Sequence, residues 1–453
     1  MWGKVIKYYA FWCFIIQERE YYFNRINCFS PLVVSHIHRK KEKQDNYKDK
    51  ISSYWTKMYY LCNVIKTLII SLPMLVCIFW SALLLLDWWE QRTRAKARML
   101  IFMVVSTALY GGHFIFFNHY HGLFPFSDTI YCMANLAVFP LYYLYIKEVT
   151  EESWQKHWQV TLLLPALLIG TAIGTLYLLM DGQETQIFID SFIYGGKQEG
   201  LSSLATAQAI LHISVKVLFA LQIPPILVKG FQKIKHYDKQ VETNYADTYL
   251  RKLYMVKTIL VLFVAASVIS FTANILGRSF FDALPWLVFI PATTFTTLLF
   301  LLGHAGHKQN FTIEDLVREN TSTTALQDRV PEPHTIEEKK DTIEKLKNEI
   351  ERVIEQEQMF LQQDLKINDV AMRLHTNRNY IYQAINVKMG VSFSEYINRL
   401  RIAYAIQLKE MNPDLSSSDI AFRSGFSSRA SFYRNMKLYQ NYPPLTYRNK
   451  QQQ

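Results

Sequence analysis

Seven long apolar runs occupy the first two thirds of the sequence. Each has about 18–23 residues, the length that an α-helix needs to cross a hydrocarbon core of ~30 Å. Only the fifth run contains a formal charge, Lys216. Seven such runs in series predict a polytopic helical membrane bundle rather than one soluble globule with buried core helices. The runs are Thr67–Leu86, Met99–Phe117, Thr129–Ile146, Trp158–Met180, Ala209–Val228, Thr258–Gly277 and Ala283–Gly303.

The composition indicates a chain divided between apolar and aqueous parts. Charged residues make up 19% of the chain, below the ~25% of ordinary soluble domains. Half of the residues are apolar, which excludes a chain that is disordered throughout. Positive charge is concentrated at the end, where residues 365–453 carry 13 Lys+Arg against 5 Asp+Glu. The five cysteines form no CxxC pair, so neither a disulfide framework nor a cysteine zinc finger is predicted.

The basic residues between the runs predict the orientation of the bundle. The connections after the first, third and fifth runs hold 13 Lys and Arg, whereas the alternate connections hold 2. By the positive-inside rule, the basic connections face the cytoplasm. The long C-terminal segment is therefore expected in the cytoplasm, and the start of the first run on the outer side.

The first 57 residues conflict with this orientation. They carry 11 Lys+Arg but would lie on the outer side. Their apolar stretch, Tyr8–Ile16, is too short to span a membrane, and it lacks the cleavage site of a signal peptide. Either the stretch is an additional cytoplasmic segment with an unrecognised membrane insertion, or translation starts at Met58, and the second interpretation is favoured.

Two polar residues within the fifth run have a functional implication. Lys216 and His212 are four positions apart and share one helix face, and exposing an ionisable residue to lipid costs at least a few kcal/mol. They are candidate sensor residues; the alternative is that Lys216 snorkels or pairs with a neighbouring helix. His113, His119 and His121 have irregular spacing and are interpreted as solvated interfacial histidines. No metal site and no cofactor is predicted.

A polar segment, residues 308–342, separates the apolar region from the C-terminal part. Its composition, with Pro331 and Pro333, predicts a flexible linker. Apolar residues at helical spacing follow it and predict an amphipathic helix with acidic flanks. This helix either packs onto the C-terminal part as its first element, which is favoured, or forms a dimerising coiled coil, for which the repeat is short. The apolar positions are Ile343, Leu346, Ile350, Val353 and Phe360.

Two C-terminal segments share one pattern: a short helix with a central alanine, a tight turn and a second helix. The alanine, Ala371 in the first and Ala421 in the second, leaves room for two helices to cross closely. The turn, four positions later, needs a left-handed residue. Gly425 adopts that conformation without steric cost, and His375 is of a type that tolerates positive φ. The pattern predicts two helix-turn-helix motifs. The segments are residues 367–390 and 417–437.

Residues 392–410 lie between the motifs and predict a single amphipathic helix. Nineteen residues at about 1.5 Å each span roughly 28 Å. That length is near the ~34 Å repeat of the double helix, so two recognition helices could enter successive major grooves.

The second helix of each motif carries side chains that suit DNA. Arg, Asn and Gln make bidentate contacts with guanine and adenine edges, whereas Ser and Lys suit phosphate contacts. All are expected on exposed faces. The candidate DNA-binding residues are Asn377, Arg378, Asn379, Tyr382, Gln383, Asn386, Lys388, Ser427, Ser428, Arg429, Tyr433, Arg434 and Lys437.

This C-terminal sequence resembles the AraC/XylS family of bacterial transcription regulators. The resemblance covers roughly residues 343–449, through INDVAMRLHTNRNYIYQAINVKMG, SSDIAFRSGFSSRASFYRNMK and PPLTYR. It implies a seven-helix domain with two helix-turn-helix motifs and sequence-specific promoter binding. The sequence departs from the family where an aromatic-Lys pair and a Gly are usual, since Met436–Lys437 and Asn441 stand there. Asn also accepts a left-handed conformation. The resemblance does not extend to the N-terminal half.

Motifs of common enzyme chemistries are absent from the sequence: there is no HExxH, GxGxxG, P-loop or GxSxG. An enzyme is not expected. We expect an all-α chain with a basic segment (1–57), a seven-span bundle (58–307), a linker (308–342) and a DNA-binding domain (343–453).

The predicted function is that of a membrane-bound one-component transcription regulator. Its expected partners are double-stranded promoter DNA, RNA polymerase, the lipid bilayer, a small-molecule or membrane signal and a second copy of the chain. The alternative is a transporter or receptor with an appended, autoregulatory DNA-binding domain. In a third interpretation, the spans only anchor that domain.

Overall fold

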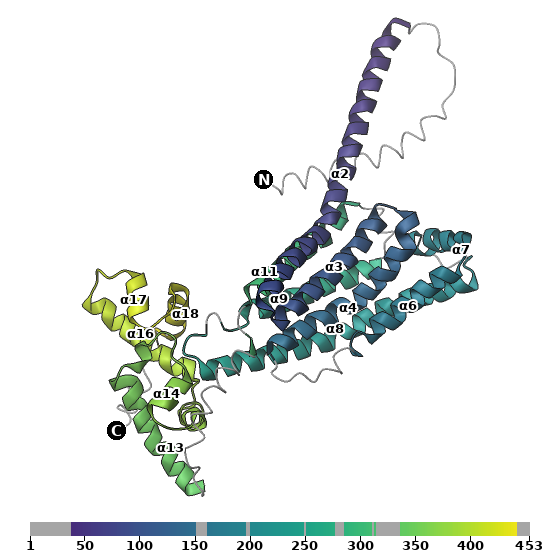
Figure 1. Cartoon of the computed structure of the whole chain (residues 1–453). Coiled ribbons are helices and arrows are strands. Elements are labelled where there is room, and N and C mark those ends of the chain that lie inside the picture. Colours follow the sequence, from purple (N-terminus) through teal and green to yellow (C-terminus); the bar gives the residue numbers. More distant parts are fainter. Residues whose placement is uncertain are drawn as a thin grey trace.

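The computed structural model of the chain is helical throughout the residues that it describes (Figure 1). These are residues 38–150, 161–195, 200–248, 251–276, 285–309, 312–313 and 336–441. Within these ranges no β-strand occurs, and an isolated bridge joins Tyr245 to Lys366. The all-α prediction is confirmed for this part of the chain.

Each predicted apolar run overlaps a helix of an N-terminal bundle. A short helix, α7 (Gly182–Ile187), and a π-helical stretch, η2 (Phe188–Tyr194), connect α6 to α8. The bundle helices are α2 (His38–Gln91), α3 (Arg94–Phe117), α4 (Phe124–Thr150), α6 (Leu164–Leu179), α8 (Ser203–Asn244), α9 (Tyr254–Leu276) and α11 (Phe289–Lys308).

Five helices in the described residues are long and apolar enough to cross a membrane. Two shorter apolar helices, Leu164–Leu179 and Val256–Ile269, accompany them. Large apolar side chains such as Leu168 and Leu178 face outward, and an apolar surface of this kind suits lipid rather than water. A count of seven spans stays a prediction. The five segments are Asn63–Gln91, Arg94–Phe117, His121–Thr150, Ser203–Asn244 and Phe289–Lys308.

Helix α8 is longer than the apolar run that predicted it. Residues 229–244, expected to belong to a connection, continue the helix as far as Asn244. The reason is that this basic stretch contains no Pro and only one Gly, Gly230, and is rich in Lys and Gln, which are good helix formers. The extension carries the chain away from the bundle to the C-terminal helices (Figure 1).

Charged side chains tie the bundle together at one end. Asp87, at the end of α2, lies 2.7 Å from His307 Nδ1 and 3.5 Å from Lys96 Nζ. Arg98 lies 3.5 Å from Glu148 at the end of α4. These residues come from the connection after the first run, the end of the third and the end of the last. The structure therefore places basic residues that predicted the orientation together at one end.

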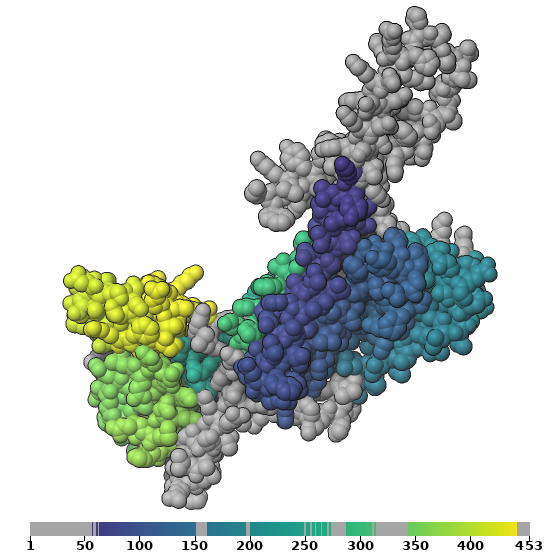
Figure 2. Space-filling view, turned by 45° about the horizontal axis from the view of Figure 1, so that its top comes forward, coloured from purple at the N-terminus to yellow at the C-terminus, as the bar shows by residue number. Residues whose placement is uncertain are grey.

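The C-terminal helices form two adjoining groups, each with its own core. The first core includes Ile354, Ala371 and Ile381, and the second includes Ala421 and Phe426. Figure 2 shows the groups side by side, in green and yellow. The elements are α13 (Ile336–Glu351), η4 (Arg352–Gln356), η5 (Met359–Leu361), α14 (Ile367–Arg373), α15 (Arg378–Tyr382), η6 (Gln383–Lys388), α16 (Phe393–Met411), α17 (Ser417–Arg423) and α18 (Arg429–Tyr439).

Helix α13 belongs to the first group. It begins at Ile336, earlier than the first predicted apolar position, and Ile350 and Ile354 are fully buried in the core of that group. The preferred interpretation, that this helix packs onto the C-terminal part, is confirmed. Helix α16 begins after the N-cap Ser392, whose hydroxyl accepts a hydrogen bond from the Glu395 amide at 3.2 Å.

Both predicted turns have the expected backbone conformation. His375 has φ +49° and Gly425 has φ +85°, and both central alanines, Ala371 and Ala421, are fully buried. Gly425 meets a second constraint, because a Cβ there would lie 2.8 Å from the carbonyl oxygen of Leu361. Only glycine satisfies both conditions.

Some predictions fall on residues outside the described part. They concern the structure of residues 1–37, most of the linker (314–335) and the PPLTYR segment at 443–448. The start of translation at Met58 and the four-part division of the chain also stay predictions.

Candidate nucleic-acid interface and bundle cavity

The first recognition helix consists of α15 and the π-helical stretch η6. Three of its seven candidate residues, Asn379, Tyr382 and Lys388, are exposed. Asn377 has a local role, because its side-chain oxygen accepts a hydrogen bond from the Asn379 amide at 2.9 Å and so caps the helix. Lys388 forms an ion pair with Glu344 of α13.

Four candidate residues of this helix are less exposed than predicted: Asn377, Arg378, Gln383 and Asn386 are half-buried. A charge interaction links Arg378 to Tyr245, which follows α8. Burial lowers the pKa of the Arg378 guanidinium, and the charge interaction with Tyr245 acts in the opposite direction. Sequence reasoning assigned a solvent-exposed face here, whereas α13 packs against α15 and η6.

The second recognition helix, α18, has a regular N-terminus. Ser428 is its N-cap and accepts a hydrogen bond from the Ser431 amide at 3.1 Å. Ser427, Arg429, Tyr433 and Lys437 are exposed, as predicted, whereas Ser428 and Arg434 are half-buried.

The connection between α8 and α9 packs into the first core and contacts the second recognition helix. Ala246 is fully buried within the first core. Its N–H donates to the Leu365 carbonyl at 3.0 Å, and its own carbonyl accepts from Asn398 and Ser394 of α16 at 2.8 and 3.0 Å. Asp247, the next residue, accepts hydrogen bonds from Ser427 and Ser431. Figure 2 shows the teal end of α8 against the green and yellow groups.

Sequence reasoning missed this docked segment. Tyr245 and Ala246 carry no motif, and their role depends on a partner surface more than a hundred residues away. One local sign was available: a stretch rich in Lys and Gln is followed by Asn-Tyr-Ala-Asp, where the composition changes from solvated to mixed. That sign does not identify the partner.

Arg401 of α16 is a second residue that the sequence did not identify. Its side chain is fully buried and donates to the carbonyl oxygens of Phe360 at 2.7 Å, Gln362 at 2.5 Å and Gln363 at 3.3 Å. Burial lowers the pKa of Arg401 to about 10, and the charge of Asp247 partly offsets this shift. Arg401 thereby joins α16 to the segment that precedes α14.

The comparisons with known proteins concern this same part of the chain. Residues 358–450 match the family model described as a helix-turn-helix domain.

The C-terminus of this chain carries a helix-turn-helix domain.

Relatives of the domain are transcriptional regulators. An 86-residue segment is 33% identical to the Msm operon regulatory protein of Streptococcus mutans and covers 19% of this chain and 31% of that protein. A 90-residue segment is 32% identical to the HTH-type transcriptional regulator YtdP of Bacillus subtilis and covers 20% and 11%, respectively. The chain thus spans less than a third of each relative. No solved structure matches the chain.

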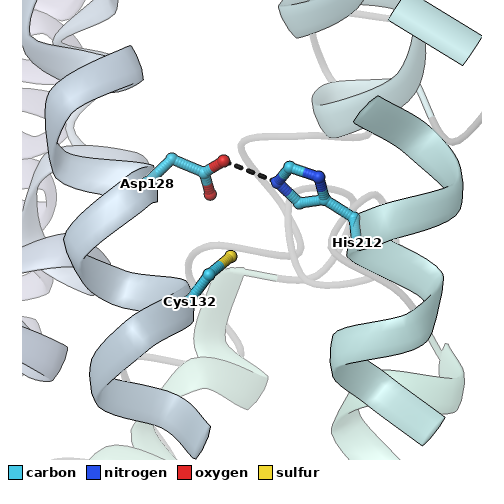
Figure 3. A group of neighbouring side chains, drawn as sticks. All are labelled: Asp128, Cys132 and His212. Carbon is cyan, nitrogen blue, oxygen red and sulfur yellow. Dashed lines mark hydrogen bonds and ion pairs between the residues drawn. The ribbon is translucent and has the colours of Figure 1, made fainter. Parts of the chain in front are cut away.

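The helix-turn-helix domain is joined to a bundle that has a polar site of its own. In Figure 3, Asp128 and Cys132 of α4 face His212 of α8. Asp128 Oδ2 lies 2.6 Å from His212 Nε2 and accepts a 2.9 Å hydrogen bond from the Tyr177 hydroxyl. The other ring nitrogen of His212 lies 2.8 Å from the Gln208 carbonyl oxygen. The predicted sensor residue His212 is therefore buried in a network.

Asp128, Cys132 and His212 are also the types of residue that bind metal ions, and their ligand atoms lie within 4.8 Å of one another. However, the 2.6 Å between Asp128 Oδ2 and His212 Nε2 is a hydrogen-bond length. Atoms that each bind zinc at about 2.0–2.2 Å stand farther apart in a tetrahedral shell. As it stands, the network orients a histidine rather than forming a coordination shell.

A cavity of about 200 Å³ opens beside this network. Its walls are mostly apolar and aromatic, and its charged lining residues are Asp128 and Lys216. Lys216, the second predicted sensor residue, is exposed and lies one helical turn from the buried His212. Asp128 connects the two, because it contacts His212 and also lines the cavity.

The three histidines interpreted as interfacial, His113, His119 and His121, do not take part in this network. His113 packs among Tyr110, Phe117 and Tyr131 and lines the cavity. His119 and His121 both lie against the ring of Tyr194. The centroids of the two imidazole rings are 6.1 Å apart.

Proposed function

We propose that the chain is a membrane-bound one-component transcription regulator. The bundle lies in a bacterial inner membrane, and the helix-turn-helix domain binds promoter DNA sequence-specifically from the cytoplasm. One observation carries this proposal: Ala246, which belongs to the bundle connection, is part of the core of the DNA-binding domain. A shift of α8 would therefore reach the domain through packed side chains.

The charged end of the bundle supports the orientation. Lys96 and Arg98 lie at one end, paired with Asp87 and Glu148. The extended C-terminal half of α8, with Lys233 and other basic residues, leads from the bundle to the helix-turn-helix domain. Basic residues gather on the cytoplasmic side of membrane proteins, which is also the side where DNA is found.

The cavity beside Asp128 supports a sensing role for the bundle. It is concave, mostly apolar and has a few polar groups, as ligand sites commonly do. A ligand that favoured one position of α8 would shift the balance between two states of the DNA-binding domain. RNA polymerase and a second copy of the chain are further proposed partners.

Genome-wide DNA occupancy of the intact protein in its native cells tests the proposal. The test variant is Asn379→Ala combined with Arg429→Ala, because both side chains are exposed on recognition helices. The matched control is Arg352→Ala, which removes a cation from η4 of the same domain. We expect discrete peaks that the double variant loses and the control keeps. Peaks that persist unchanged in the double variant would contradict DNA recognition through these helices.

A transporter with an appended regulatory domain is the second candidate function, and the Lys216-lined cavity is the observation that favours it. The variant Lys216→Met removes the charge, whereas Lys216→Arg keeps it. If Lys216→Met abolished solute uptake and left promoter occupancy intact, transport would be the function. If it changed only occupancy, as we expect, the cavity would serve sensing.

A further inference from the structure

The geometry points to Asp247 as an internal competitor of the DNA backbone. Its carboxylate occupies the position at the N-terminus of recognition helix α18 where a DNA phosphate would bind, so the described conformation is closed to DNA. This inference rests on the proposed function and adds a residue that couples the bundle to DNA binding.

The carboxylate of Asp247 is held by two hydroxyl donors of the second motif. Ser431 Oγ donates to Asp247 Oδ1 at 2.9 Å, and Ser427 Oγ donates to Oδ2. Asp247 and Ser431 are both buried. The site lies at the first turn of an 11-residue helix capped by Ser428. Helix N-termini attract anions through their unpaired amides and the helix dipole.

The same donors suit a phosphate of DNA. In helix-turn-helix proteins the N-terminal residues of the recognition helix enter the major groove. Serine hydroxyls and helix N-termini are common phosphate donors. Ser427 and Ser431 cannot donate to Asp247 and to a phosphate at the same time. A carboxylate beside a phosphate would also repel it.

The segment around Asp247 adjoins further candidate DNA-binding residues. Tyr245, two positions before Asp247, has a charge interaction with Arg378 of the first recognition helix. Arg434 of α18 lines a crevice of about 110 Å³ together with Glu242 of α8 and Thr248 of the connection. One short segment of the bundle thus joins the core beneath the first recognition helix through Ala246 and contacts the second recognition helix through Asp247, so a single displacement of the segment would act on both.

The position of Asp247 in the chain makes the contact a means of control. Asp247 lies three residues after the end of α8. The same helix carries His212, and its Lys216 lines the cavity of the bundle. A change in the position of α8 would pull Asp247 away from Ser427. Release of the carboxylate would then expose both hydroxyls to DNA.

The test measures binding of the full chain, in detergent micelles, to a fluorescent 30-base-pair duplex of arbitrary sequence. This probe needs no known promoter, because non-specific binding depends on phosphate contacts. The variant is Asp247→Asn, which keeps the side-chain shape but loses the charge. The matched control is Asp414→Asn, an exposed carboxylate in the loop between α16 and α17 of the same domain.

We expect Asp247→Asn to bind the duplex at least about tenfold more tightly than the unchanged protein, as expected when charge-assisted donors are freed. The plot of log affinity against log salt should be steeper by about 0.9, the value for one additional phosphate contact. Asp414→Asn should differ less than about twofold from the unchanged protein, the scale of one exposed charge. Equal or weaker binding by Asp247→Asn would overturn the proposal.

A reversible disulfide crosslink between positions 247 and 427, here called the lock, provides a second test in case Asp247→Asn disturbs folding. Combining Asp247→Cys with Ser427→Cys places two thiols where the carboxylate and hydroxyl now meet. The oxidised protein should bind the duplex at least about tenfold more weakly than the same protein after reduction. Equal binding in the two redox states, with the crosslink verified by mass, would overturn the proposal.

The outcomes also separate this inference from the proposed function. If the reduced lock, Asp247→Asn and the unchanged protein all failed to bind any duplex, DNA binding itself would be wrong, and the inference would be overturned with it. If all three bound equally, the regulator would stand and only the role of Asp247 would be overturned.

Discussion

The side-chain amide of Asn398 donates a 2.8 Å hydrogen bond to the carbonyl oxygen of Ala246, 152 positions earlier in the chain. Ser394 donates to the same oxygen at 3.0 Å. The pair joins α16, the helix between the two motifs, to the bundle connection. Because Ala246 is fully buried, water cannot replace these donors, and the docked segment depends on them.

Replacement of Asn398 by Ala should loosen this segment. We expect the variant to lose about 1–2 kcal/mol of the free energy that holds residues 245–247 in place, since Ser394 remains as a donor. Hydrogen exchange of the Ala246 amide, measured by mass spectrometry on the full chain, reports this value. The control is Asn412→Ala in the loop after α16. Equal exchange in both variants would contradict the prediction.

Gly425→Ala should destabilise the second motif more than Gly390→Ala destabilises the first. Both glycines have positive φ, +85° and +71°, respectively, which costs other residues roughly 1–2 kcal/mol. At Gly390 a Cβ meets nothing within 4 Å, whereas at Gly425 it meets the Leu361 backbone. Urea unfolding of the C-terminal helices, followed by circular dichroism, should show a larger loss for Gly425→Ala by at least about 1 kcal/mol. Equal losses would contradict the prediction, because they would mean that the Leu361 backbone shifts to make room for the new Cβ at little cost.

Tyr396 should make the domain less stable in alkali. Burial raises the pKa of its phenol, and Glu355, which accepts its 2.8 Å hydrogen bond, adds to the shift. The unfolded chain releases this proton near pH 10.0, the unperturbed value, while the folded chain keeps it. The contribution of the Tyr396 phenol to the free energy of unfolding is therefore fully present below that pH. Above it, this contribution falls by up to ~1.4 kcal/mol per pH unit.

The difference in unfolding free energy between the unchanged protein and Tyr396→Phe isolates the contribution of the Tyr396 hydroxyl. At pH 8 the variant should be about 1–2 kcal/mol less stable, because it lacks the hydrogen bond to Glu355. Between pH 10 and 11 the gap should narrow, since Phe has no proton to release. Urea unfolding across this pH range is the measurement. A difference in unfolding free energy that stays constant with pH would contradict the raised pKa of Tyr396.

Asp128→Asn should weaken the bundle near the cavity. Asp128 is buried and contacts both His212 and Tyr177, so the variant loses a charged acceptor of two hydrogen bonds. We expect a loss of about 2–4 kcal/mol in stability in detergent, measured by thermal unfolding. Asp190→Asn, at an exposed carboxylate of the same bundle, serves as the control. A smaller loss at Asp128 than at Asp190 would assign the network no structural role.

The helix-turn-helix domain shows which local features could be predicted. Ala371 and Ala421 are buried, and His375 and Gly425 are left-handed, as their spacing indicates. These features depend on contacts within about ten residues of sequence, so the pattern is sufficient. The exposure of Arg434 was not predictable in the same way, because it lines a crevice with Glu242 and Thr248 from another part of the chain.

The sequence by itself determined the apolar helices and the two helix-turn-helix motifs, because periodicity and turn residues act locally along the backbone. Only the tertiary structure decided that His212 meets Asp128, 84 positions earlier, and that Asp247 meets Ser431, 184 positions later. Connections of unspecified geometry separate those partners, so their meeting depends on how whole helices pack. The control that we propose for DNA binding lies in this second set of contacts.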